Sequence, residues 1–542
     1  MIEREGTGSL ERNQRTEFVE TDPLIMDTLQ VSYTNLPSTE SADELQQFLD
    51  SSGTLWSTKE EDVVRRKIDV RVLSWLCVMF FVMQINRISI QNVITTSFLE
   101  DLGLTQADYS TGQTIYTVAF MIFEIPSQVM QMVVGPVLWL PLETIIFGIS
   151  AFSQTFVNSK TTHFICRACL GGSQGGYIPG LSFYLTSFYK TSETSLRVAI
   201  FWMTMYITNA LSALLSTFIF QSSAEQASRY HDWQILFALE GLFTIGIGII
   251  SFFMLPSLQS HRISRIFTTR EENILRARVI LDDRSKSVMF VPRKRLGRLL
   301  SKFKLSNFRE TFTDVYLLYI FLLGIIGFLP SITSYHFLTI IFHSDLGYST
   351  TEANLLVIPG NLLLVLSMVT VARICDQRHL HFIAPLIAMA WVIPPLAVLI
   401  ALPATTAATW IRTICVTLLV GFPYYTPTLI SWISANSNDA QKRGLAIAIY
   451  NVCVQIGNII AVNTYRQSDK PYYRVGNIGL VVVSIITIGV TMNIRKLYLS
   501  ENRKRSMIWD SMTDSQRDDY IRDVFADPQQ PGNERFDFRL KL

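Results

Sequence analysis

Arg87 lies near the middle of Val72–Phe98, an apolar stretch about as long as a helix that crosses a lipid bilayer. Burying a guanidinium at that depth costs at least about 2.5–3.5 kcal/mol, so Arg87 should face a protein interior or a wet cavity rather than lipid. Its fixed charge and planar fork suit carboxylate, sulfonate or phosphate oxygens. Arg87 therefore either binds an anion at the membrane centre or pairs with an internal glutamate to hold helices together.

More polar side chains lie in the apolar stretches that follow. Glu124 is placed to pair with Arg87 or Arg167, or to bind a proton where it is desolvated. Arg167 and Gln174 are seven residues apart, which puts them two turns apart on one face of a helix. Gln174 can line a cavity but cannot titrate. These residues predict a polar site between helices, and Tyr116 is a further candidate to contact a bound substrate.

Glycines at four-residue spacing accompany these side chains. The pairs are Gly171 with Gly175 and Gly172 with Gly176. Such spacing lets a neighbouring helix approach closely. A phosphate-binding loop is the alternative, but that loop joins a strand to a helix, whereas these glycines are inside an apolar stretch. We therefore expect close helix packing here.

The second half of the chain adds further candidates. Asn451 belongs to a polar stripe at helical spacing, which either lines the cavity or forms hydrogen bonds between helices. His336 is either a proton site or a packing residue near a helix end. Tyr424, Tyr425 and Trp432 either form aromatic walls of a cavity or anchor the chain at the membrane interface.

Composition indicates an all-α polytopic membrane protein. Hydrophobic residues make up 49% of the 542 residues and charged residues 17%, against about 25% charged residues in soluble domains. Apolar runs predict twelve transmembrane helices. The spans are Val72–Phe98, Gly112–Val133, Val137–Phe156, Phe164–Phe188, Val198–Phe220, Trp233–Leu255, Val315–Phe342, Ala353–Val371, Phe382–Leu402, Trp410–Ile433, Leu445–Tyr465 and Gly476–Ile494.

The intervals between the spans predict five regions. Residues 1–61 form a disordered acidic tail, 62–255 a six-helix bundle, 256–314 a basic loop, 315–494 a second six-helix bundle and 495–542 a second tail.

Basic residues predict the orientation of the chain in the membrane. A basic amphipathic segment, Lys59–Arg71, leads into the first span, and further Lys and Arg follow the eighth, tenth and twelfth spans. Such residues mark the cytoplasmic side, so both termini are expected in the cytoplasm.

Several classes of protein are disfavoured by what the sequence lacks. It holds no P-loop that would bind ATP, no repeated channel-filter motif and no catalytic or metal-ligand cluster, so we expect neither an enzyme nor a cofactor. A net charge of +2 gives no reason to expect nucleic acid as a partner. Two six-helix halves are instead typical of secondary transporters, whose substrates bind near the bilayer midplane.

The chain resembles the fungal allantoate permease family, in the anion:cation symporter branch of the major facilitator superfamily, over roughly Lys59–Arg505. The motifs that carry the resemblance are RRKIDVRVL before the first span, Arg87 with Ile90 and Asn92, EIPS at Glu124, Arg167 with Gly171 and Pro179, DWQILFALEG from Asp232, ANLLVIPG from Ala353, Trp432 with Asn436, Lys442 and Arg443, and PYY from Pro471 followed by Gly476.

This resemblance implies import of a small organic or sulfur-containing anion across a fungal plasma membrane, with protons and by alternating access. Family substrates include ureides such as allantoate, vitamins, dipeptides and sulfur compounds. The segments GQTIY, QGGYIP, DKPYY and SMTDSQRDDY are most similar to sulfonate and thiosulfate permeases. We expect a monomer in which Arg87 binds the anion, helped by Arg167, Gln174, Tyr116 and Asn451.

Two positions depart from the family pattern and affect proton coupling. Related anion symporters carry Asp before the arginine of the first span and Glu seven residues after the arginine of the fourth, where this chain has Asn86 and Gln174. Glu124 and His336 are then the remaining candidates for coupling or ion pairing. The alternatives are an uncoupled anion uniporter and a nutrient sensor that transports nothing.

Overall fold

The structure, a computed structural model, is helical throughout the part of the chain that it describes. That part is residues 56–93, 97–225, 231–257, 266–282, 286, 309, 311–348, 350–402, 409–437, 440–470, 472–517, 520, 536 and 539–542. Most of the predicted tail 1–61 and of the basic half of the loop 256–314 lies outside these residues.

The N-terminal half starts with a capped helix. The Ser57 hydroxyl accepts a hydrogen bond from the Glu60 backbone N–H at 3.3 Å, and the Glu60 carboxylate accepts one from the Ser57 N–H at 3.0 Å. These bonds satisfy backbone groups that the first turn leaves free. The elements of this half are α3 (Thr58–Ile68), η1 (Asp69–Leu73), α4 (Ser74–Val93), α5 (Phe98–Asp101), α6 (Gln106–Val134), α7 (Pro136–Ser153), η2 (Gln154–Phe156), α8 (Lys160–Gln174), α9 (Tyr177–Thr186), α10 (Thr191–Glu225) and α11 (Asp232–Met254).

The C-terminal half follows a short helix, α12 (Thr269–Asp282), that belongs to the connecting loop. Its last helix runs on to Ser511, beyond the predicted end at Ile494, because polar residues prolong it outside the apolar run. The elements of this half are α15 (Val315–Ile326), α16 (Leu329–Ile340), η5 (Ile341–Asp345), α17 (Thr350–Arg378), α18 (Ile383–Ala401), α19 (Thr409–Val420), α20 (Thr426–Ala435), α21 (Ala440–Val462), η7 (Gln467–Asp469) and α22 (Arg474–Ser511).

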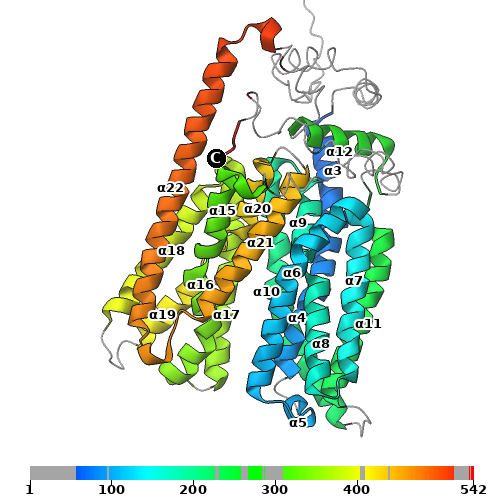
Figure 1. Ribbon diagram of the computed structural model, residues 1–542, viewed down its shortest axis with the longest axis vertical. Helices are drawn as coiled ribbons and strands as arrows, with labels where there is room; N and C mark the ends of the chain where they lie inside the picture. The colour runs from blue at the N-terminus through cyan, green and yellow to red at the C-terminus, as the bar shows by residue number, and fades with distance from the viewer. Residues whose placement is uncertain are drawn as a thin grey trace, which may run out of the picture.

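Nine helical segments in the described residues are long and apolar enough to cross a membrane. The three other predicted spans coincide with α8 and α9, with α10, and with α19 and α20. The two bundles stand side by side, with α3 and α12 at one end and α5 at the opposite end (Figure 1). We call these the α12 end and the α5 end.

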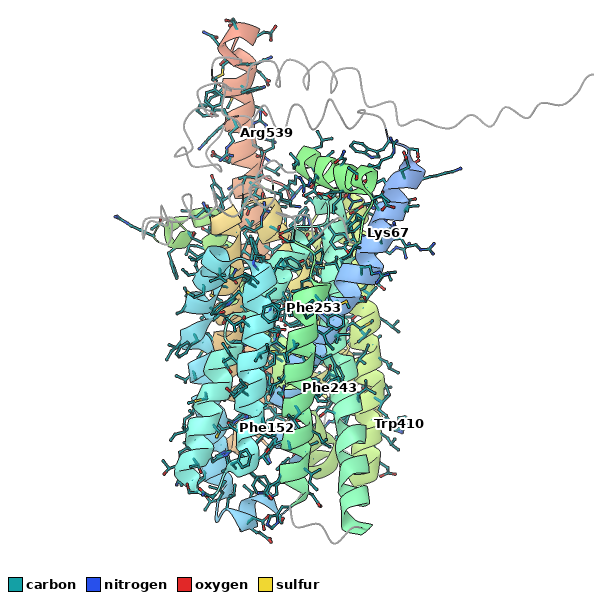
Figure 2. The ribbon with its side chains drawn as sticks, turned by 90° about the vertical axis from the view of Figure 1, so that its right-hand side faces the viewer. Lys67, Phe152, Phe243, Phe253, Trp410 and Arg539 are labelled. Atoms are coloured by element: carbon teal, nitrogen blue, oxygen red, sulfur yellow. The ribbon has the colours of Figure 1, made fainter. Side chains whose placement is uncertain are left out.

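The outer surface agrees with a lipid environment. Phe243, Phe253 and Trp410 are 51%, 71% and 65% exposed along the middle and lower part of the molecule, whereas Lys67 and Arg539 lie toward the α12 end (Figure 2). Exposed aromatic side chains of this kind are stable against hydrocarbon rather than water.

An ion-pair network fastens the α12 end of the N-terminal bundle. Arg278 of α12 is fully buried and contacts Glu193 of α10 at 2.5 Å and Glu61 of α3 at 3.3 Å. Lys67 pairs with Glu271 at 2.5 Å. Partial burial raises the pKa of Glu271, but its hydrogen bonds, first that from Lys67, outweigh burial and leave the pKa below its ordinary value. The network holds α12 against α3 and the start of α10, at the end of the molecule where the first span begins.

The predicted close packing at the glycines of the fourth span is confirmed. A Cβ on Gly171 would lie 2.2 Å from the Tyr116 carbonyl oxygen, and one on Gly175 would lie 2.6 Å from the Phe120 carbonyl oxygen. Helices α6 and α8 therefore pack backbone against backbone, which brings the polar residues of both helices together.

Candidate functional site

Two arginines lie against one aromatic ring in the N-terminal bundle. The guanidinium carbon of Arg87 on α4 is 5.9 Å from the ring centroid of Tyr116 on α6, and that of Arg167 on α8 is 4.6 Å from it. Phe120 adds a second ring 5.7 Å from the Arg87 guanidinium. The faces of aromatic rings attract cations, so these rings hold both guanidinium groups without neutralising them.

The hydrogen bonds around Tyr116 place two more of the predicted site residues. The Tyr116 hydroxyl donates to Gln174 Oε1 at 2.5 Å, and Arg167 Nη2 donates to the Gln113 side-chain oxygen. Arg167 Nη1 and Gln174 Nε2 are buried and have no hydrogen-bond partner among the described residues. Two buried donors thus remain available for an acceptor, and an unpaired buried donor costs about 1–3 kcal/mol.

The predicted residues Glu124 and Asn451 meet between the two bundles. Asn451 Nδ2 on α21 donates to Glu124 Oε1 on α6. Glu124 is fully buried, and its second oxygen, Oε2, has no hydrogen-bond partner in the described structure. Asn451 therefore belongs to a contact between helices, which was one of the two interpretations of its polar stripe.

The fourth span of each half is interrupted near the membrane centre, although the sequence predicts two continuous helices. In the first half α8 ends at Gln174, Gly176 has a φ of +84°, and α9 starts at Tyr177. In the second half Gly421 to Tyr425 is not helical. Interruptions at matching positions of two repeats are typical of the substrate site of a transporter, because irregular backbone inside a membrane must line a cavity or pack in protein.

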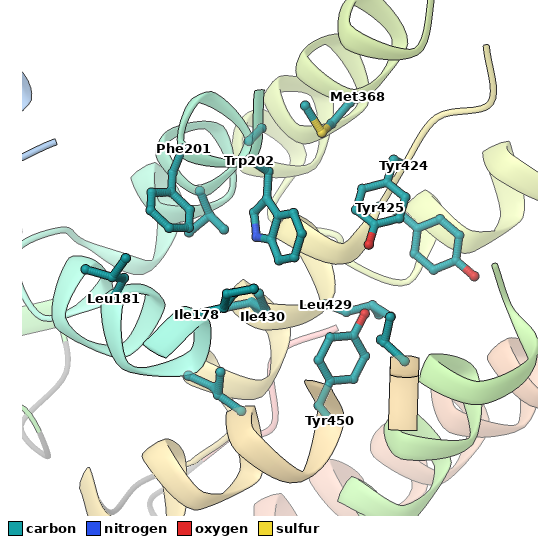
Figure 3. Close-up of a cluster of buried hydrophobic side chains, with 14 of the residues drawn as sticks. Ile178, Leu181, Phe201, Trp202, Met368, Tyr424, Tyr425, Leu429, Ile430 and Tyr450 are labelled. Atoms are coloured by element: carbon teal, nitrogen blue, oxygen red, sulfur yellow. The ribbon is translucent and has the colours of Figure 1, made fainter. Parts of the chain in front are cut away.

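An apolar cluster surrounds the interruption in the second half. It combines Phe201 and Trp202 of α10 with Tyr424, Tyr425 and other side chains of the C-terminal bundle (Figure 3). The rings of Trp202 and Tyr424 are 5.8 Å apart and come from different bundles. Tyr424 therefore packs between the bundles, whereas Tyr425 packs inside its own bundle against Phe328 and Phe422. Neither lies at the membrane interface, since both are buried.

Two inter-bundle hydrogen bonds lie nearer the α12 end than this cluster. The carboxylate of Asp376 on α17 accepts the backbone N–H of Ser195 at 3.1 Å and that of Leu196 at 2.8 Å, both near the start of α10. A carboxylate at a helix N-terminus is favoured by the helix dipole. The two bundles are thus closed on each other at the α12 end.

Two further residues from the sequence lie apart from this group. His336 on α16 has an exposed side chain, and its ring is 6.5 Å from that of Tyr335. Asn86 is buried and faces the last helix of its own bundle, where its Nδ2 donates to Thr244 Oγ1 at 2.8 Å. The structure therefore places Arg87, Tyr116, Arg167 and Gln174 together and Glu124 and Asn451 together, and no contact among the described residues joins His336 to either set.

Sequence reasoning did not single out two other buried glutamates. Glu143 on α7 accepts a hydrogen bond from the Ser127 hydroxyl at 2.6 Å, and Glu240 on α11 accepts one from the Ser89 hydroxyl. Both are 3% exposed. Each lies inside a predicted span, where acidic residues are rare, so the sequence alone could have drawn attention to them.

Comparisons with known proteins agree with this architecture. Residues 76–462 match the Major Facilitator Superfamily. The chain is 30% identical to the uncharacterized transporter YIL166C of Saccharomyces cerevisiae, over 96% of each chain.

Solved structures show the same fold at low sequence identity. The proton:xylose symporter XylE aligns with a TM-score of 0.52 at 13% identity, covering 79% of this chain and 95% of its own. The major facilitator transporter FucP in its outward conformation aligns with a TM-score of 0.53 at 10% identity, covering 78% and 98%. Family match, relatives and fold together make this chain a multi-pass membrane transporter of the Major Facilitator Superfamily.

Proposed function

We propose that this protein imports a small organic or sulfur-containing anion together with protons, by alternating access. The observation that carries the proposal is the pair Arg87 and Arg167 at the ring of Tyr116. Neither guanidinium forms an ion pair with a carboxylate in the described part of the chain, and Arg167 and Gln174 each keep an unpaired buried donor. Two uncompensated cations in a low-dielectric site favour binding of an anion.

The link between Glu124 and Asn451 supports proton coupling. An ionised carboxylate at a fully buried position carries a large desolvation cost, which proton binding removes. Because the partner of Glu124 is on the other bundle, a change of its protonation state acts directly on the contact between bundles. XylE, which shares this fold, is a proton:xylose symporter, in keeping with proton coupling here.

This chain lacks two acidic residues that related anion symporters carry, and their absence favours a strongly acidic substrate. Asn86 and Gln174 stand where related anion symporters carry acidic residues, so the charges of Arg87 and Arg167 are less compensated here. A sulfonate or thiosulfate keeps its negative charge at any cellular pH, and a planar guanidinium binds its oxygens well. The resemblance to sulfonate-type permeases points to the same class.

The distribution of basic residues supports a cytoplasmic α12 end. Basic side chains are found at this end in three places. These are the segment before α4, the turn after α17 and the part of α22 beyond the apolar run. The conformation described here would then be closed toward the cytoplasm, as expected of an importer that waits for substrate at a plasma membrane.

The decisive experiment is uptake of labelled anions into cells that lack their own carriers, with and without a proton uncoupler. The panel holds a sulfonate, thiosulfate, allantoate, nicotinate and pantothenate. We expect uptake of a sulfonate or thiosulfate that collapses with the uncoupler. Uptake of none of these anions, in cells that carry the protein at their surface, would contradict the proposal and favour a sensor.

A uniporter is the second candidate, and the exchange of both family carboxylates for Asn86 and Gln174 favours it. Under that function the same anion enters but only to equal concentrations on both sides. Uptake that is insensitive to the uncoupler would identify the uniporter and remove Glu124 from the coupling role.

A further inference from the structure

Residues Leu540–Leu542 occupy a groove at the α12 end of the C-terminal bundle, and the transport function does not account for them. Asn502 on α22 pairs with both backbone groups of Leu540: its Nδ2 donates to the carbonyl at 2.8 Å and its Oδ1 accepts from the N–H at 2.8 Å. Asn436, directly after α20, does the same with Lys541, at 3.0 Å and 2.8 Å. Each amide thus replaces the neighbouring strand that an extended peptide would meet in a sheet.

Further donors complete the recognition of the backbone. Trp432 Nε1 donates to the Lys541 carbonyl at 2.8 Å. The backbone N–H of His381, in the turn between α17 and α18, donates to the Leu542 carbonyl at 2.6 Å. Three elements far apart in the sequence therefore contact three successive residues. An incidental surface contact would not need so many partners.

The side chains of the segment divide between the two bundles. Leu540 is 4% exposed within the apolar core, and Leu542 packs against the same core. Lys541 reaches the other bundle, where its Nζ donates to Thr191 Oγ1 at 3.2 Å. Thr191 is the first residue of α10 and is itself held by Asp282, whose carboxylate accepts its N–H and its hydroxyl at 2.7 Å each.

The hydrogen bond from Lys541 to Thr191 lies beside the other inter-bundle contact of the α12 end. Lys541 contacts the first residue of α10, and Asp376 accepts the N–H groups of Ser195 and Leu196 one turn later. Opening the α12 end requires the start of α10 to move away from the C-terminal bundle, so both contacts would break together.

We infer that Leu540–Leu542 is a latch: a peptide segment of the chain that docks between α20, α22 and the α17–α18 turn and holds the α12 end closed. Its release permits the opposite conformation, so occupancy of the groove sets how readily the transporter opens at this end. The docking itself is independent of the proposed function, whereas its effect on opening rests on alternating access.

Docking is tested with a labelled peptide of residues 535–542 and the purified chain from which Arg539–Leu542 has been deleted. We expect saturable binding that Asn436→Ala and Asn502→Ala each weaken at least tenfold. Asn463→Ala is the matched control, because Asn463 is exposed and its side chain donates to the Ile459 carbonyl of α21, the helix that ends directly before it. Absent binding, or equal binding to all variants, would overturn the inference.

The chain that lacks Arg539–Leu542 could fail to purify as a folded protein. Hydrogen exchange on the undeleted chain tests docking in that case. The amides of Leu540 and Lys541 should exchange at least tenfold faster in the Asn436→Ala, Asn502→Ala double variant than in the parent chain. Unchanged exchange would equally overturn docking.

The latch effect is tested by labelling Ser195→Cys in a chain whose six native cysteines are replaced. Ser195 is fully buried beside Asp376, whose carboxylate accepts its backbone N–H at 3.1 Å. Deletion of Arg539–Leu542 should raise the rate of maleimide labelling at least threefold. Binding of the peptide with an unchanged labelling rate would overturn the latch, and failure of the anion panel alone would refute the transport proposal but not the docking.

Discussion

Glu124 and Asn451 join the two six-helix bundles through a buried hydrogen bond, although they are 327 residues apart in the sequence. Glu124 lies on α6 eight residues after Tyr116, the ring against which both arginines lie. Under the proposed function, substrate charge, protonation and bundle contact would therefore meet on one stretch of α6, which is the arrangement that coupled transport needs. An anion at Arg87 and a proton at Glu124 would each change the electrostatic environment of the other.

Glu124→Gln is expected to separate exchange from accumulation. The amide has the shape of the acid but cannot bind or release a proton, so substrate should still exchange across the membrane while net uptake stops at equal concentrations. Counterflow and accumulation in the same vesicles measure the two properties. Glu143→Gln is the matched control, because Glu143 is equally buried but bonds to Ser127 inside one bundle. Full accumulation by Glu124→Gln would exclude Glu124 as the coupling residue.

Arg87→Ala is expected to reduce initial uptake by roughly 30-fold or more, because truncation of one partner of a buried charge contact costs about 2–5 kcal/mol. Arg87→Lys keeps the charge but loses the planar fork, so it should fall between the parent chain and alanine. Uptake is divided by the amount of protein at the cell surface. Arg466→Ala removes an exposed arginine at the α5 end and should leave uptake unchanged. Normal uptake by Arg87→Ala would refute the anion site.

Gly171→Ala is expected to destabilise the N-terminal bundle by about 1–3 kcal/mol, the usual cost of overpacking. The new methyl group would lie 2.2 Å from the Tyr116 carbonyl oxygen, so α6 and α8 must separate. A fluorescence thermal-shift assay in detergent measures the change in midpoint. At Gly489 a Cβ meets no atom within 4 Å, so Gly489→Ala should be neutral or stabilising. Equal midpoints for the two variants would show that the helices adapt without cost.

Much of the fold follows from local sequence properties. Length and hydropathy predict the spans, because both depend on neighbours within a few residues. The glycine spacing predicts a close helix contact, but the structure is needed to identify the partner of α8 as α6. The breaks at Gly176 and at Gly421–Tyr425 were not predicted, since glycine, proline and aromatic residues also occur in continuous membrane helices.

Long-range pairings were beyond the reach of a single sequence. The stripe that contains Asn451 predicted either a cavity or a helix contact, and only the three-dimensional arrangement shows that its partner is Glu124. In the same way nothing in the predicted tail 495–542 distinguishes Leu540–Leu542 from a solvated segment. Asn436 and Asn502 recognise backbone atoms, and backbone recognition leaves little trace in the sequence of the bound segment.

Acidification is expected to weaken docking of the 535–542 peptide. His381 is buried against Leu542, with its Nδ1 3.3 Å from the Leu542 carbonyl and its Nε2 3.3 Å from the Ser431 hydroxyl. Burial first, with the nearby charges of Lys541 and His379, lowers the pKa of His381 to about 4, although the hydrogen bond to Leu542 opposes this shift. A lowered histidine pKa means that the docked state binds fewer protons than an undocked state in which His381 is solvated.

Docking should therefore be at full strength above about pH 6.5, the ordinary value for histidine, and weaken as the pH falls toward 4. Between pH 7 and pH 5 the peptide affinity should fall on the order of tenfold, by linkage to the one proton that His381 takes up on release. Titration of the labelled peptide at the two pH values measures this ratio. His381→Asn cannot take up the proton, so its affinity should change little with pH, and an equal pH dependence in both chains would assign the effect to another group.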